Sequence, residues 1–164
     1  MSASRAPLAD RTLGEVLAAL ASDAVSPGSG AAATVALAFA AACAGKALAI
    51  SRKHRPETES MRGAEQHVAD LIRRSLERAD ADARYFEEFI HHKSAQAASE
   101  LLCADEKSQG LAHELGRVLD EVEPTIHPAV VTDIAAARLL LSAASAIEKR
   151  IQIENRAAVR SKKP

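Results

Sequence analysis

Hydrophobic residues recur three or four positions apart through most of this chain, which is the spacing that places them on one face of an α-helix. The spacing predicts five helices, over about residues 12–23, 31–52, 56–92, 98–121 and 130–158. The predicted fold class is therefore all-α. We expect a single-domain antiparallel bundle of about five helices in which the third and fifth are long.

Caps and prolines mark where these helices begin and end. Thr12 and Glu15 have the spacing of a capping box, in which each residue satisfies a backbone N–H at the start of a helix. Pro56 opens the third helix, because proline is well tolerated in a first turn. Pro124 closes the fourth helix and Pro128 opens the fifth.

The length of the chain sets the number of domains. Its 164 residues can bury one sizeable core but hardly two. The domain is expected over residues 12–158, between a flexible polar lead-in at residues 1–11 and a basic tail at residues 159–164. A helix over residues 56–92 would be roughly 55 Å long at about 1.5 Å per residue. That exceeds a compact monomer of this size, so we expect part of it to pack on a second subunit.

The stretch Ser26-Pro27-Gly28-Ser29-Gly30 is a tight turn that leads directly into an alanine-rich run over residues 31–45. Proline fixes one backbone angle, and glycine permits conformations closed to other residues. The free N–H groups at the start of the following helix suit a carboxylate, a phosphate or a polar ring edge. The alanines themselves predict the buried central helix of the bundle.

The composition of the chain bears on its fold class, its partners and its location in the cell. Hydrophobic residues make up 48% of the chain and aromatic residues only 2%, which favours closely packed helices over a β-sandwich. The net charge of −1 gives no general attraction to nucleic acid or membranes, and neither is expected as a partner. The apolar run is shorter than the roughly 20 residues of a membrane span, and Lys46 follows it. With two cysteines and no signal-peptide core, the chain is expected in the cytoplasm.

Acids on the third helix are the first candidates for chemistry. Asp80 and Asp82 stand beside the apolar stripe, and Asp82 lies one turn before Phe86. A carboxylate against apolar surface can have its pKa raised enough for general acid or base catalysis, although a solvated surface acid has the same pattern. Asp133 is a helix cap or a site residue. The single Glu-x-x-His pair is too little for a di-iron bundle, so no metal is expected.

Four segments together resemble one family, in the same order along residues 12–155. TLGEVLAALASDAVSPGSGAAATVALAFAAACAGKAL resembles the short helix, Ser-x-x-Pro-Gly-Gly-Gly-Ser turn and alanine-rich helix that open the formiminotransferase-cyclodeaminase C-terminal domain and the related methenyltetrahydrofolate cyclohydrolases. Asp82-Ala83-Arg84-Tyr85-Phe86 resembles the family's Asp-Ala-x-Ala-Phe. Residues 132–137 (TDIAAA) resemble its Ser-Asp-Leu-Gly-Val-Ala, and residues 148–153 (EKRIQI) occupy the place of its Asn-Val-x-Ile-Asn-Leu.

The resemblance implies an all-helical homodimer with a folate-binding cleft near the subunit interface. Such proteins close 5-formiminotetrahydrofolate to 5,10-methenyltetrahydrofolate with loss of ammonia, or hydrolyse the methenyl compound to 10-formyltetrahydrofolate. No metal or other cofactor is implied beyond the tetrahydrofolate derivative itself. By this resemblance Asp82 is the acid/base carboxylate. The implied substrate-binding residues are Pro27, Gly28, Ser29, Gly30, Phe86, Asp133, Glu148 and Arg150.

The chain also departs from the family pattern at expected ligand contacts. Ser29 replaces a glycine and Ala31 a serine in the turn, and Glu148 and Gln152 stand where the family has asparagine. The family's Val-Pro-Leu is absent around residues 106–108. Three hypotheses therefore remain: a folate cyclohydrolase or cyclodeaminase, an enzyme for another substrate on the same scaffold, or a non-catalytic helical dimer that binds a ligand or a protein.

Overall fold

The computed structural model of the chain describes residues 6–54, 59–92 and 94–161. These residues form five α-helices and three short 3-10 helices, with no strand among them. The α-helices are α1 (Leu13–Leu20), α2 (Ser29–His54), α3 (Glu59–His92), α4 (Ala95–Val122) and α5 (Val131–Ser161), and the 3-10 helices are η1 (Leu8–Asp10), η2 (Glu123–Thr125) and η3 (Pro128–Val130). The prediction of an all-helical fold is confirmed.

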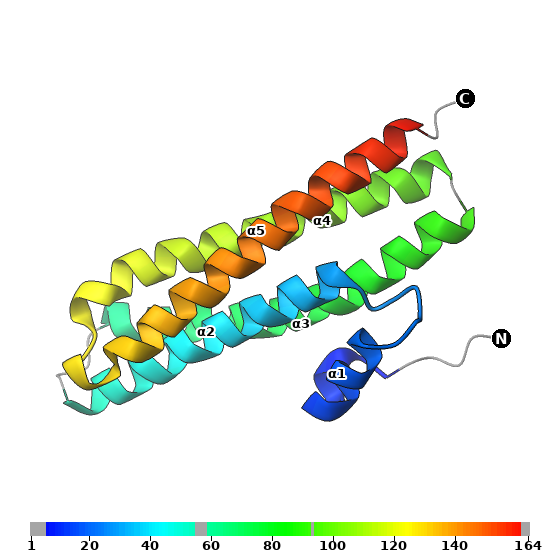
Figure 1. The fold of residues 1–164 in the computed structure, drawn as a ribbon. Coiled ribbons are helices and arrows are strands. Elements are labelled where there is room, and N and C mark those ends of the chain that lie inside the picture. The colour runs from blue at the N-terminus through cyan, green and yellow to red at the C-terminus, as the bar shows by residue number, and fades with distance from the viewer. Residues whose placement is uncertain (1–5, 55–58, 93, 162–164) are drawn as a thin grey trace.

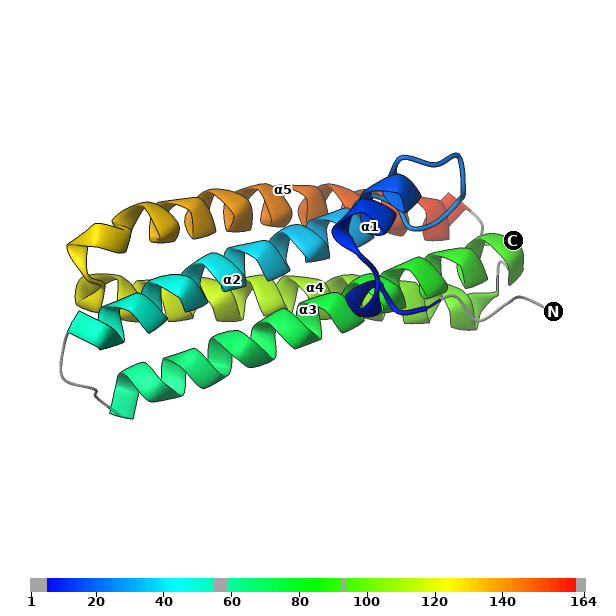
Figure 2. The ribbon, with the colours of Figure 1, turned by 90° about the horizontal axis from the view of Figure 1, so that it is seen from below.

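The long helices α2 to α5 lie side by side along the length of the molecule (Figures 1 and 2). The end of α2, the start of α3 and the start of α5 share one end of the bundle, and the end of α3 and the start of α4 share the other (Figure 1). Helix α2 packs mainly against α3 and α5, and α4 packs against the same two helices. Helix α1 lies outside this group, beside the start of α2 (Figure 2).

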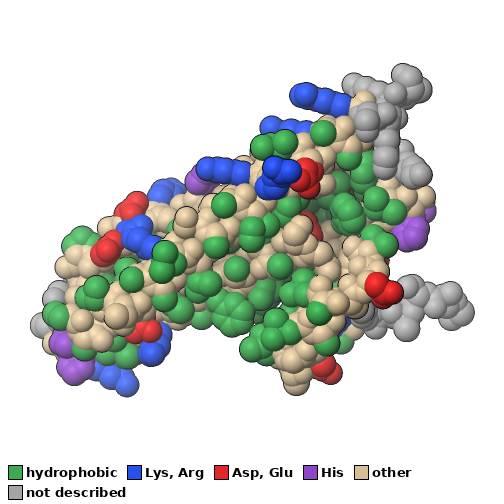
Figure 3. All heavy atoms as spheres, in the orientation of Figure 1, with side chains coloured by type: hydrophobic (Ala, Val, Ile, Leu, Met, Phe, Trp, Pro, Cys, Tyr) green, Lys and Arg blue, Asp and Glu red, His purple; other side chains and the backbone are tan. Residues whose placement is uncertain are grey.

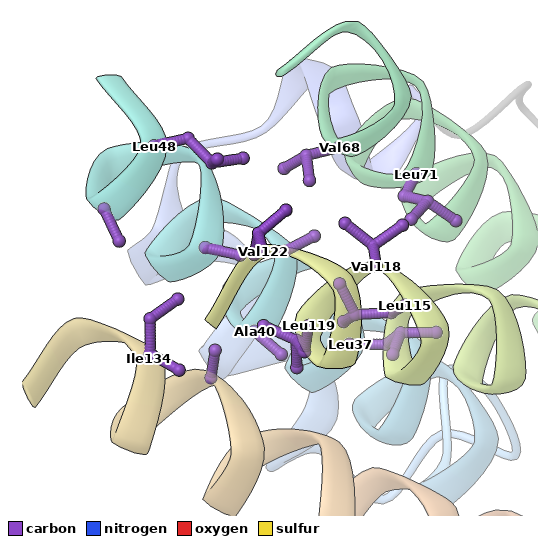
Figure 4. Packing of buried hydrophobic residues seen from close by; sticks show 14 of the residues in the cluster. Leu37, Ala40, Leu48, Val68, Leu71, Leu115, Val118, Leu119, Val122 and Ile134 are labelled. Atoms are coloured by element: carbon purple, nitrogen blue, oxygen red, sulfur yellow. The ribbon is translucent and has the colours of Figure 1, made fainter. Parts of the chain in front are cut away.

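The main core lies where α2 meets α3, α4 and α5 (Figure 4). Four alanines of α2 that face it have no exposed surface, which lets the neighbouring helices approach its backbone closely. Larger aliphatic side chains from the other helices fill the remaining space. The core includes Leu37, Leu48, Val68, Leu71, Leu115, Leu119 and Ile134.

The alanine-rich sequence predicts that helix α2 is buried on every side, but one side of it is exposed. Phe39 is 46% exposed, and on the neighbouring helix Leu139 is 72% exposed. Hydrophobic side chains are visible across this face of the molecule (Figure 3). The composition of the helix alone does not reveal that one side of it is left exposed by the described residues.

The helix boundaries differ from the predicted ones by a few residues. The predicted capping box is present, with Thr12 Oγ1 accepting from the N–H of Glu15 at 3.3 Å. Helix α1 ends at Leu20, three residues before the predicted end. Helix α4 begins at residue 95 rather than 98, because Ser94 Oγ caps it by accepting from the N–H of Ala97 at 3.1 Å. The predicted start of the third helix at residue 56 lies outside the described residues.

The ends of the domain also differ from the expectation. Leu8, within the lead-in expected to be flexible, is 5% exposed and begins η1. Its N–H donates to both carboxylate oxygens of Asp80, at 3.0 and 3.1 Å, and so fastens the N-terminal segment to α3. At the other end, α5 continues through residue 161 into the expected tail. Residues 162–164 lie outside the described part.

Two segments of the described chain are long and apolar enough to cross a membrane by length and composition alone. They are α2 and the stretch from Pro128 to Arg160. In α2, 50% of the most apolar window is buried inside the bundle, as in the core helix of a soluble protein, against 22% in the second stretch. This is weak evidence for a membrane span.

Candidate functional site

A cavity of about 210 Å³ lies where the turn before α2 meets α3 and α5. The turn and the first residues of α2 form one wall, the middle of α3 forms a second, and the last third of α5 forms a third. The lining residues are Ser26, Gly28, Ser29, Gly30, Asp82, Ala83, Phe86, Ile151, Glu154 and Asn155. The cavity thus combines apolar surface with two carboxylates and one amide.

Asp82 lies against the first turn of α2. Its carboxylate accepts a hydrogen bond from the backbone N–H of Ala31, one of the unpaired donors that begin the helix. A Cβ atom added at Gly30 would overlap both oxygens of this carboxylate. Residue 30 is therefore a glycine because the carboxylate of Asp82 lies too close to its backbone for a side chain. No glycine among the described residues has a positive φ, so the conformational reason suggested by the sequence does not apply.

The turn is held to α3 by a second contact. The bond between Ser26 and Pro27 is cis, and Ser26 is only 4% exposed. Its Oγ donates to Oε1 of Glu87 at 2.5 Å. Glu87 follows Asp82 by five residues on the same helix, so α3 contacts the turn on both sides of the cavity.

Asp82, which is partly buried, belongs to a group of three carboxylates from three different helices, and the other two are buried. Asp105 of α4 is 2% exposed and Glu148 of α5 is 5% exposed. Asn155, two turns after Glu148, donates from Nδ2 to both oxygens of Asp105, at 3.1 and 3.2 Å. This bond links α4 to α5 directly behind the cavity.

Burial shifts all three acids in the same direction. It raises the pKa of Asp82 from 3.8 to about 6, with the charge of Asp105 adding to the effect. Burial raises the pKa of Glu148 from 4.5 to about 8, with Asp82 and Asp105 adding to it. The pKa of Asp105 is raised by burial, against the opposing hydrogen bond from Asn155.

Arg78 is the cation that faces this group. Its charge opposes the upward pKa shift of each of the three acids. Its Nε and Nη2 atoms are buried and have no hydrogen-bond partner among the described residues. Arg156 also opposes the shift of Asp105, but the effect of burial is larger at all three acids. With these pKa values, Asp82 is mainly ionised and Glu148 mainly protonated near pH 7. The first can accept a proton and the second can donate one.

The structure brings most of the predicted site residues together. Gly28, Ser29, Gly30, Asp82 and Phe86 line the cavity. Pro27 lies in the same turn, and its peptide bond with Ser26 is the cis one. Glu148 is buried beside the cavity, near enough for Asp82 to shift its pKa. The partly buried position of Asp82 differs from the solvated surface acid that the pattern also allowed.

Of the other predicted residues, Asp133 lies away from the cavity of this chain, and Arg150 contacts the cavity lining only through Glu154. Asp133 is in the first turn of α5, where it pairs with Lys46 at 3.3 Å. It precedes Glu148 by fifteen residues, which is about 22 Å along a helix at about 1.5 Å per residue. The side chain of Arg150 is 77% exposed and pairs with Glu154 at 2.5 Å.

Sequence reasoning missed Ser26, Arg78, Asp105 and Asn155. A signal existed for Asp105, because it follows Leu101 by four residues and so interrupts the buried face of α4 with a charge. Asn155 lies seven residues, or two turns, after Glu148 and so shares its face. For Arg78 the sequence offers no signal, since an arginine on a long polar helix is usually solvated.

Among the described residues, no group of three or more histidine, cysteine, aspartate or glutamate side chains is arranged to hold a metal ion. The three carboxylates are thus near one another without converging on one point. Their neighbours are a guanidinium and an amide, which suits proton transfer and hydrogen bonding.

Comparison with known proteins gives one finding. No curated protein matches the chain. A family model described as formiminotransferase-cyclodeaminase matches residues 12–110. The matched segment runs from the cap of α1 through the turn, Gly30 and Asp82 to Asp105, and stops before α5. Because it covers more than half of the chain, the protein belongs to the formiminotransferase-cyclodeaminase family.

Proposed function

We propose that this protein is an acid/base enzyme of folate one-carbon metabolism, either a methenyltetrahydrofolate cyclohydrolase or a formiminotetrahydrofolate cyclodeaminase. The family supports a folate-related function. The observation that carries the proposal is the position of Asp82, a carboxylate at the wall of a cavity with its pKa raised to about 6. Such a group exchanges protons readily near neutral pH.

Both reactions pass through a tetrahedral carbon between two nitrogens. In hydrolysis, water adds to the methenyl carbon and ionised Asp82 accepts one proton from that water. Asp82 returns this proton to N5 as the bond between N5 and the carbon breaks, and the remaining hydroxyl proton is released to solvent as the oxygen becomes the formyl carbonyl. In deamination, N10 attacks the formimino carbon, Asp82 accepts the N10 proton, and the amino group leaves as ammonia after protonation. Neither route transfers electrons, so we propose the folate derivative as the only small molecule required.

The excess of carboxylates at the cavity favours a substrate whose reacting group is positively charged. The methenyl bridge is a positively charged amidinium, and a formimino group is an amidine that becomes cationic on protonation. Asp105 would add to the attraction of ionised Asp82, whereas Glu148 is mainly protonated near neutral pH and adds little charge, and Arg78 opposes the attraction. The same charge arrangement favours, as the second candidate, an amidine-bearing substrate other than folate on this scaffold.

The small size of the cavity supports binding of only one part of the ligand inside it. About 210 Å³ is below the roughly 300–1,000 Å³ of a site for a drug-sized molecule. We propose that the ring bearing the one-carbon group enters and that the remainder lies outside. The exposed apolar face of α2 and α5, with Phe39 and Leu139, is the surface on which we propose a second subunit of a homodimer packs.

The decisive experiment follows the loss of methenyltetrahydrofolate absorbance at a pH where spontaneous hydrolysis is slow, and in parallel the release of ammonia from 5-formiminotetrahydrofolate. Asp82→Asn removes the ionisable group at nearly constant size, and we expect the rate to fall about 100-fold or more, as for loss of a general base. Asp120→Asn is the matched control, because that side chain is 72% exposed on α4.

Acceleration by the parent protein and by the Asp120 variant, but not by the Asp82 variant, would support both the reaction class and the assigned carboxylate. No acceleration of either reaction by the folded parent protein would eliminate the folate proposal. Equal rates for parent and Asp82 variant would remove Asp82 from the mechanism and leave the reaction class standing.

A further inference from the structure

A second cavity, of about 510 Å³, lies along the seam between α3 and α4. Its walls are one face of each helix, at residues 74–85 of α3 and residues 107–114 of α4. Gly110 and Ala81 form part of the lining, so small side chains keep the seam open. The volume falls within the roughly 300–1,000 Å³ that small-molecule sites occupy. We name this cavity the α3–α4 cleft.

The charges lining the cleft do not cancel. Arg74 is balanced by Glu114, whose two oxygens accept from its Nη1 and Nη2 at 2.7 and 3.1 Å. Glu77 is balanced by Arg73, outside the lining, at 2.6 Å. Arg84 and Lys107 form no ion pair with any described residue, and two nitrogens of Arg78 have no hydrogen-bond partner in that part of the chain.

Tyr85 orders two of these cations. The guanidinium carbon of Arg84 lies 5.0 Å from the centre of its ring, and that of Arg78 lies 5.8 Å from it. Stacking on an aromatic ring restricts a long side chain that would otherwise be mobile. Arg78 also faces the carboxylates of the first cavity, which offset part of its charge, whereas Arg84 and Lys107 form no ion pair in the described part of the chain.

We propose that the α3–α4 cleft binds a small phosphate-bearing anion, at a site separate from the folate cavity. A phosphate monoester carries close to two negative charges at neutral pH and offers three acceptor oxygens. Planar guanidinium groups bind such oxygens in pairs, and Lys107 adds a point charge from the opposite helix. A monocarboxylate matches only part of this charge. The proposal does not depend on the reaction at Asp82.

The test is a calorimetric titration of the full chain with inorganic pyrophosphate in a low-chloride buffer. A parallel titration uses glutarate, a dianion without phosphorus. We expect saturable binding of one pyrophosphate per chain. Arg84→Gln and Lys107→Gln should each weaken binding about tenfold, as for the loss of one charged hydrogen bond. Arg117→Gln is the control, because it removes one positive charge from an exposed position of α4 that does not line the cleft.

A second pair of variants tests the location. An added Cβ meets nothing within 4 Å at Gly110 or at Gly63, and both are helical. Gly110→Glu places bulk and negative charge in the cleft and should abolish binding, whereas Gly63→Glu should leave it unchanged. Binding that does not saturate, that the Arg117 control weakens equally, or that glutarate matches in affinity would overturn the proposal, and so would full binding by the Gly110 variant.

Discussion

Glu148 shows how a single residue acquires a property that its sequence position does not reveal. It stands where the family is expected to have asparagine, which suggests a change from a neutral to a negative group. In the structure it is 5% exposed beside two other carboxylates, and its pKa is raised to about 8. A protonated glutamate is neutral and can donate a hydrogen bond, as an amide can. The substitution is therefore milder at neutral pH than the sequence indicates.

This shift makes the stability of the protein depend on pH. Between pH 4.5 and 8 the folded protein retains a proton on Glu148 that the unfolded chain has released, so raising the pH favours unfolding. The dependence is about 1.4 kcal/mol per pH unit and amounts to as much as roughly 4–5 kcal/mol over the whole range. The raised pKa values of Asp82 and Asp105 act in the same direction.

Glu148→Gln should remove most of this dependence. Urea unfolding at pH 5 and pH 8.5 measures it: the parent protein should lose several kcal/mol between the two, and the variant clearly less, because glutamine does not titrate. Glu106→Gln, at a side chain that is 67% exposed, is the control and should behave like the parent. If the parent protein is equally stable at both pH values, Glu148 is not protonated in the folded state.

At the level of the helices, the start of α2 packs directly against α3. Gly30 and the backbone N–H of Ala31 meet the carboxylate of Asp82, so the acid of one helix satisfies the start of another. The sequence predicted an anion site at this helix start, and the anion is a side chain of the same protein. Favourable interaction with the helix start lowers the pKa of Asp82, but burial has the larger effect.

Gly30→Ala tests this contact. The added methyl group overlaps the carboxylate of Asp82, so the carboxylate must move, and we expect kcat/KM to fall about 100-fold or more. We also expect a loss of about 1–3 kcal/mol from overpacking, partly offset because alanine favours helix over glycine by roughly 1 kcal/mol. Gly63→Ala is the control, since this helical glycine does not line the cavity and nothing lies within 4 Å of its added Cβ. Equal activity of both variants would contradict the contact.

Local features of the elements were predictable, and their spatial relations were not. Periodicity, the Thr12 capping box and the turn before α2 identify the helices because each depends on residues within a few positions. The convergence of Asp82, Asp105 and Glu148 depends on the rotation and register of three helices that are far apart in sequence. The start of α4 was missed because a serine cap without a neighbouring proline or glycine is a weak signal.

At the scale of the whole molecule, the two faces of the bundle differ in character. The α3–α4 side carries the charged cleft, whereas α2 and α5 expose Phe39 and Leu139. Long exposed helices with large apolar side chains are typical of subunit contacts. The chain contains no further segment among its described residues that covers this face, which supports the proposed homodimer.

Light scattering coupled to gel filtration tests the dimer. The parent protein should have twice the mass of the chain, and the double variant Phe39→Lys with Leu139→Lys should be a monomer, because two desolvated charges on each subunit oppose association. Arg138→Lys, one position away and charge-conserving, should remain a dimer. A parent protein that is monomeric at every concentration would exclude a homodimer, and a dimeric double variant would place the contact on another face.

The contact between Gly30 and Asp82 also restricts how the sequence can evolve. A side chain at residue 30 displaces the carboxylate, and loss of the carboxylate leaves an N–H of α2 without its partner and an open space beside it. Neither residue can change alone without damage, so the two should covary. In relatives that keep an aspartate at this point of α3, the glycine should be kept as well, and chains that have lost the aspartate should be free to carry a larger residue in the turn.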